Sequence, residues 1–121
     1  MNPQKIGERE LLGRNTLRLL CSVLIKPGTR VEMCQMIEPG VFADVEQMVI
    51  FQEILALGPV ESKRLRELLP ARVTRRGFPE FDLDEFLAPS AVSEQEIEKL
   101  FESAFRLVEL SETEESQPSD L

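Results

Sequence analysis

The sequence predicts an all-α fold: a single-domain bundle of about six helices over residues 1–110, followed by a disordered acidic tail at residues 111–121. Three observations lead to this prediction. Residues 41–59 carry a helix start signal and a helix stop signal around an almost wholly apolar segment. The segments on both sides repeat apolar residues at helical spacing. The tail is acidic and nearly free of apolar side chains, so it cannot offset the entropy lost on ordering.

The apolar segment is expected to form the central helix of the bundle. Asp44 can cap its start, with Gln47 three residues on to return the capping bond, and Gly58 ends it. Glu46 and Glu53 share one narrow strip of the helical wheel, and nearly every other side chain is apolar. An amphipathic surface helix needs only one apolar stripe, so this helix must be covered on several sides.

Two helices are predicted before the central one. The first runs from about residue 7 to residue 25 and ends before Pro27, because proline disfavours a helical residue in front of it. It contains Gly13, which costs about 1 kcal/mol relative to alanine. A close contact between helices at this glycine would be one reason for it. Thr29 can then cap a short second helix over residues 31–37, with a glutamate at the capping-box position.

A compact helix is expected after Pro59, with its leucines facing inward and its bases facing outward. Pro70 is expected to close this helix. Residues 71–81 contain Gly77 and Pro79, and they are interpreted as a loop or a short extended piece.

Capping signals predict the remaining helices. Asp82 can cap a single turn, and Ser93 with Glu96 forms a capping box for the last helix. Seven apolar side chains of that last helix fall within an arc of roughly 160° and give it a well-formed amphipathic face: Ile97, Leu100, Phe101, Ala104, Phe105, Leu107 and Val108.

Composition places the chain among soluble globular proteins, with 42% apolar and 30% charged residues in 121. The amino terminus lacks the apolar run of a signal peptide, and no window approaches a transmembrane length, so we expect a cytoplasmic protein without membrane contact. Cys21 and Cys34 are each placed inside a predicted helix. We interpret them as buried small hydrophobic residues rather than a disulfide.

The residues available for chemistry argue against an enzyme. The chain contains no histidine, so the commonest general base and the usual zinc ligand sets are missing. No glycine-rich phosphate loop is present. Asp82, Asp84 and Glu85 lie close together, but capping and a solvated face explain them. We therefore expect no catalytic residue, no cofactor, no metal and no small-molecule substrate.

The charge is unevenly distributed, and this is the most informative feature of the composition. Residues 63–77 carry six bases and one acid, whereas residues 78–121 carry two bases and thirteen acids, in a chain of net charge −8. The basic segment is the candidate contact site for nucleic acid or for a partner protein. Its bases are Lys63, Arg64, Arg66, Arg72, Arg75 and Arg76. Pairing of these bases with the downstream acids, or plain solvation, is the alternative interpretation.

Two motifs carry a resemblance to a known family. The first helix begins with an ExxLLG-like pattern, formed here by Glu8, Leu11, Leu12 and Gly13. A longer signature follows, formed here by Ile37, Pro39, Phe42, Asp44, Ile50, Phe51, Ile54, Leu55 and Leu57. In these motifs the chain resembles the amino-terminal domain of bacterial replicative DNA helicases and the related helicase-interaction domain of bacterial primases. The match covers residues 8–69 and, more loosely, residues 82–110.

The resemblance implies a docking module that works by contact between helices and that carries over no catalytic residue. We therefore expect a non-enzymatic protein–protein interaction module, with a replication protein or a second copy of the chain as its partner. The alternative is a small nucleic-acid-associated regulator that uses the basic segment 63–76. Nucleic acid ranks second, because an acidic chain repels a polyanion outside that one segment.

Overall fold

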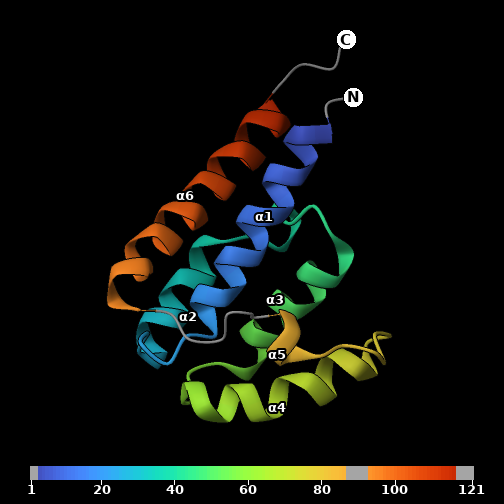
Figure 1. Ribbon diagram of the computed structural model, residues 1–121, viewed down its shortest axis with the longest axis vertical. Coiled ribbons are helices and arrows are strands. Elements are labelled where there is room, and N and C mark those ends of the chain that lie inside the picture. Colours follow the sequence, from blue (N-terminus) through green and yellow to red (C-terminus); the bar gives the residue numbers. More distant parts are fainter. Residues whose placement is uncertain (1–2, 87–92, 117–121) are drawn as a thin grey trace.

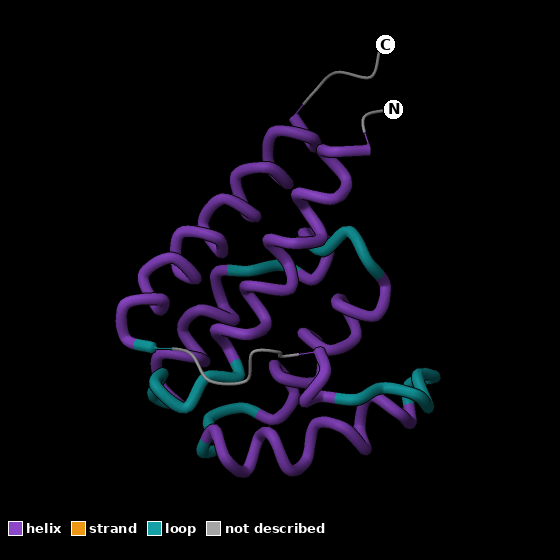
Figure 2. The backbone as a smooth tube through the Cα atoms, in the orientation of Figure 1, coloured by secondary structure: helices purple, strands orange, loops and turns teal. Residues whose placement is uncertain are grey.

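The computed structural model describes residues 3–86 and 93–116, and this part of the chain contains helices and no strand (Figures 1 and 2). The all-α prediction is confirmed. The helices are α1 (Pro3–Leu20), α2 (Pro27–Met36), α3 (Val45–Leu57), α4 (Ser62–Arg75), α5 (Leu83–Phe86) and α6 (Glu94–Ser116), with a short 3-10 helix η1 (Pro39–Val41) between α2 and α3. None of these helices is both long enough and apolar enough to cross a membrane.

The two longest helices, α1 and α6, run antiparallel beside each other (Figure 1). The α3 helix packs against α1 and α4, and α4 lies across the opposite end of the molecule from the start of α1 and the end of α6 (Figure 1). The larger of two clusters of buried residues joins these elements. Its fully buried members include Leu17 and Leu20 of α1, Ile50 and Phe51 of α3, and Leu107 of α6.

The central position of α3 is confirmed. Val49, Ile50, Phe51 and Ile54 are all buried, and the side chain of Asp44 accepts a hydrogen bond from the backbone N–H of Gln47 at the expected cap. Gly58 ends the helix at φ 68°, a left-handed conformation that favours glycine.

The Gln47 side chain does not return the capping bond, so that prediction is wrong. It crosses to α1 instead, where its Nε2 donates to the backbone oxygen of Glu10 at 2.9 Å. A Cβ at Gly13 would overlap Oε1 of Gln47. The close helix contact suggested for Gly13 is therefore present, and it is made by this glutamine.

The first helix ends at Leu20, five residues before the predicted boundary. Cys21 and the residues up to Lys26 form a turn, so the placement of Cys21 within a helix is wrong. Contacts from α4 hold this turn: Nε of Arg66 donates to the oxygen of Cys21 at 2.7 Å, and Oγ of Ser62 donates to the oxygen of Ser22 at 3.0 Å. These bonds satisfy carbonyl groups at the end of the helix.

The second helix begins at Pro27 rather than after Thr29, and it has no side-chain cap. Proline is favoured in the first helical turn because its fixed φ suits the helix and its missing N–H has no partner there in any case. The residue treated as a stop signal for the first helix is therefore the start of the second.

The fourth helix continues through Pro70 to Arg75, so the loop predicted over residues 71–81 begins later, after α4. Leu65, Leu69 and Val73 lie every fourth residue along α4 and are fully buried. Burial of Val73 stabilises the turn after the proline, and this offsets the hydrogen bond that proline removes.

Both capping signals near the carboxyl end are confirmed. Asp82 accepts from the N–H of Glu85 at 3.2 Å at the start of α5, and Ser93 and Glu96 exchange hydrogen bonds of 3.2–3.3 Å at the start of α6. The α6 helix extends to Ser116, past the predicted boundary at residue 110, and Ser111 is buried. Residues 117–121 of the predicted tail lie outside the described residues.

Candidate functional site

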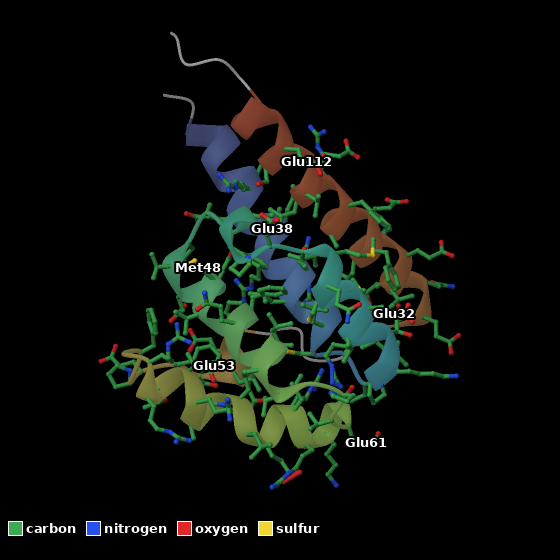
Figure 3. All side chains as sticks on the ribbon, turned by 180° about the vertical axis from the view of Figure 1, so that it is seen from behind. Glu32, Glu38, Met48, Glu53, Glu61 and Glu112 are labelled. Atoms are coloured by element: carbon green, nitrogen blue, oxygen red, sulfur yellow. The ribbon has the colours of Figure 1, made fainter. Side chains whose placement is uncertain are left out.

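The structure engages most of the predicted basic segment with partners inside the protein. Nε of Arg72 lies 2.8 Å from Oε1 of Glu53, and Nη1 of Arg76 lies 2.6 Å from Oε2 of the same carboxylate. Arg76 also donates to the side chain of Gln52 at 2.7 Å. Figure 3 shows Glu53 where α3 faces α4. The partner of these two arginines is therefore an acid of the central helix, rather than one from the acidic segment downstream.

The other bases lie along α4. Arg66 holds the turn after α1 through Cys21, and Arg64 makes an exposed ion pair of 3.8 Å with Glu67. Lys63 and Arg75 are exposed to solvent. Of the six predicted site residues, Lys63, Arg64 and Arg75 keep their side chains clear of the core and of the Glu53 cluster.

A second surface feature was not predicted as a site. An open groove of about 360 Å³ lies between α2 and α6. Its residues are mostly apolar: Thr29, Glu32, Met33, Met36 and Ile37 from α2 and the residue that follows it, and Phe101, Ala104, Phe105, Val108 and Glu109 from α6. Two large apolar side chains in this groove face solvent, since Met36 is 65% exposed and Phe105 is 58% exposed.

The predicted apolar face of α6 is therefore only partly used inside the protein. Leu100, Ala104 and Leu107 are buried, as expected, whereas Phe105 is not. Helical periodicity places all of these residues on one face, but it cannot say how wide a part of that face the neighbouring helices cover. The apolar arc of α6 is wider than a helix needs in order to pack against one neighbouring helix. This width was the sequence signal that part of the apolar face would stay exposed.

Glutamates line the groove and the hollow beside it. Glu32 and Glu109 belong to its walls, and Glu38 and Glu112 line a smaller hollow of about 180 Å³ that also includes Met36 and Val108. Figure 3 shows Glu32, Glu38 and Glu112 on the side of the molecule formed by α2, η1 and α6. Arg106 is the base on this part of α6, and it makes long ion pairs of 3.8 Å with Glu109 and 3.9 Å with Glu8. All the charged residues that line the groove and this hollow are therefore glutamates.

The predicted acidic cluster has a structural role at α5. Asp82 caps the helix, and Arg14 of α1 donates to the backbone oxygens of Phe86 at 2.9 Å and Glu85 at 3.1 Å. The guanidinium of Arg14 also lies 5.5 Å from the centre of the Phe86 ring. Among the described residues, no group of acids and cysteines is arranged to hold a metal ion. The contacts of Arg14 therefore hold α5 against α1.

The two cysteines are buried free thiols, as predicted. Burial raises the pKa of Cys21 to about 12 and that of Cys34 to about 11, despite the nearby positive charge of Arg30. A thiol with so high a pKa is protonated at neutral pH and is a poor nucleophile or metal ligand.

Arg30 is a buried charge that the sequence did not single out. Arg30 is only 1% exposed. Its guanidinium donates hydrogen bonds through both terminal nitrogens to the backbone oxygen of Val60. Burial lowers its pKa. The bond ties α2 to the connection between α3 and α4, so Arg30 has a structural role.

Comparison of the chain with models of protein families, with curated proteins and with solved structures found no match.

Proposed function

We propose that this protein is a non-enzymatic docking domain that binds another protein through exposed helix faces. The observation that carries the proposal is the groove between α2 and α6, where Met36 and Phe105 present large apolar side chains to solvent within one concave surface. Concave apolar surfaces rimmed by polar groups are typical of binding sites. Burial of these two side chains by a partner would gain roughly 25 cal/mol for each Å² of apolar surface covered.

The resemblance to the docking domains of replicative helicases and primases supports the same class of function. Those domains act by helix-to-helix contact with partner or sister subunits. A replication protein is therefore the first kind of partner to test, and a second copy of this chain is the next.

Nucleic-acid binding through the basic segment is less well supported. Arg72 and Arg76 form ion pairs with Glu53, and Arg66 donates a hydrogen bond to the turn after α1. A phosphate would have to compete with these contacts, and it would also meet the repulsion of a chain with net charge −8.

Affinity capture from a lysate of the source cells tests the proposal. We expect the wild-type chain to retain proteins that the Phe105→Asp variant does not retain. Val45→Asp is the matched control, because Val45 is also more than half exposed, at 64%, but lies outside the groove. Retention of the same proteins by the Phe105 variant would show that docking does not use this groove. Failure of the wild type to retain any protein would contradict the proposed function.

The nucleic-acid alternative has its own test. Binding of labelled single-stranded and double-stranded DNA should be measured at low and at physiological salt, with the double variant Lys63→Ser/Arg75→Ser as comparison. We expect negligible binding by both proteins. A sub-micromolar affinity of the wild type at physiological salt that is lost in the double variant would favour the alternative, because phosphate contacts depend steeply on salt.

A further inference from the structure

We infer that the groove between α2 and α6 receives an amphipathic helix with a basic character, a short segment of a partner protein with apolar anchors on one face and Lys or Arg beside them. This inference rests on the proposed docking function and names the chemistry of the occupant. The shape of the groove, its charge and the residue types in its walls each contribute to it.

The shape fits a helix. Phe101, Phe105 and Glu109 lie four residues apart along α6, so the groove follows that helix for about 12 Å at a rise of 1.5 Å per residue. Glu112 extends this line by about one further turn. A partner helix laid along the groove would present residues at positions i, i+4 and i+7 over this length, which is the usual pattern for a helix bound in a groove.

The residue types suit an apolar face with some tolerance of sequence. Met33 and Met36 contribute two flexible thioether side chains to one wall, and Phe101 and Phe105 contribute two rings to the other. Methionine adapts its shape to the side chain that it meets, and sulfur makes favourable contacts with aromatic rings. Met33 also packs on the cluster of Leu19, Ile25 and Leu100, so the floor of the groove is anchored in the core.

The charge decides between the possible occupants. Glu32 and Glu109 line the groove and Glu38 and Glu112 line its extension, and the residues that line these two hollows include no Lys or Arg. Bases beside the apolar anchors would complement this rim, and acids there would be repelled. The chain's own residues 117–121, QPSDL, contain one acid and no base, and a second copy of the chain brings a net charge of −8. Both fit the rim less well than a basic helix from another protein.

Selection from a displayed library of random 16-residue peptides tests the inference directly. The wild-type chain of 121 residues serves as bait, and Phe105→Asp serves for counter-selection. We expect enriched peptides to carry a net positive charge and apolar residues at i, i+4 and i+7. Synthetic versions should bind at least tenfold more weakly to Phe105→Asp and to Met36→Asp, and with unchanged affinity to Val45→Asp. Both groove positions are more than half exposed, so the variants should fold, and a thermal melt checks this.

The charge is tested separately with the double variant Glu32→Lys/Glu112→Lys. Its affinity for the enriched peptides should fall about tenfold, and raising the salt concentration should weaken wild-type binding more than binding by this variant. Enriched peptides that are neutral or acidic, that bind the Phe105 variant as well as the wild type, or that ignore the glutamate changes would overturn the inference. An absence of any enrichment would overturn it too.

Sedimentation of the wild type and of Phe105→Asp tests whether a second copy of the chain occupies the groove. A wild-type dimer that the Phe105 substitution dissociates would show that the groove holds another copy of this chain, and it would refute the basic helix. This outcome leaves the proposed docking function standing. If the Phe105 variant still captures the lysate proteins, the proposed docking function stands, but the groove is not the surface that carries it.

Discussion

The carboxylate of Glu53 on α3 and the guanidinium of Arg72 on α4 meet at 2.8 Å across the interface between the two helices. Arg76 approaches the second oxygen of the same carboxylate at 2.6 Å. The Glu53 side chain is only 12% exposed, whereas the two arginines remain about two-fifths exposed. One acid of the central helix thus holds the end of α4, beyond Pro70, against the core.

This cluster should make stability depend on pH. Partial burial alone would raise the pKa of Glu53, but hydrogen bonds from Arg76 and Arg72, together with their charges, outweigh burial and leave its pKa below the ordinary value. Because the folded pKa is the lower one, the contribution to stability is present above the unfolded pKa and is lost as the pH falls through the folded pKa. The free energy of unfolding should therefore fall more in the wild type than in Glu53→Gln between about pH 5 and pH 3.

Denaturant titrations at several pH values measure this difference. At neutral pH, Glu53→Gln should cost about 1 kcal/mol, since solvent screens the exposed sides of the arginines. Glu67→Gln is the control, because its pair with Arg64 is exposed and should contribute almost nothing. Equal acid sensitivity of the wild type and the Glu53 variant would contradict the role assigned to the cluster.

Gly13 and Gln47 should be coupled. Gly13→Ala would gain helix propensity, about 1 kcal/mol, but its Cβ would displace a buried glutamine whose Nε2 is bonded to Glu10. We expect a net loss of about 1 kcal/mol in the wild-type background. In a Gln47→Ala background the same substitution should be neutral or stabilising. A double-mutant cycle of unfolding free energies measures the coupling, and additive effects would argue against the contact.

Phe51 should be among the most sensitive positions of the core. It is fully buried, and its ring centre lies 5.2 Å from that of Phe42. Phe51→Ala should cost about 3–5 kcal/mol, through lost burial and the cavity left behind. Val45→Ala, an exposed position on the same helix, should change the unfolding free energy by less than about 0.5 kcal/mol. Thermal melts compare the two, and an unchanged melt of the Phe51 variant would rule out the central position of α3.

The cysteines should be unreactive in the native protein. With pKa values raised by burial to about 12 for Cys21 and about 11 for Cys34, almost no thiolate is present at neutral pH. A colorimetric thiol reagent should label neither residue in buffer and both in denaturant. Rapid labelling of the native chain would show that the turn at Cys21 opens readily.

Elements with local signals could be predicted from the sequence. The cap at Asp44, the stop at Gly58 and the capping box of Ser93 and Glu96 each involve residues close together along the chain, so residue type and spacing suffice. The enclosed position of α3 followed in the same way from its apolar composition. The six bases could be found in the sequence, but their partners could not, because Glu53 lies about twenty residues from Arg72 and Arg76.

The remaining features depend on contacts between residues that lie far apart in the sequence. The local sequence around Pro70 predicts a helix end. The α4 helix continues beyond it because Val73 is buried and the arginines that follow bond to Glu53. The exposure of Phe105 depends on where α2 stands beside α6, which no local pattern encodes. Local hydrogen bonds and periodicity thus determined where most helices begin and which face is apolar. Packing between distant segments determined where α1 and α4 end, and which part of an apolar face remains open to a partner.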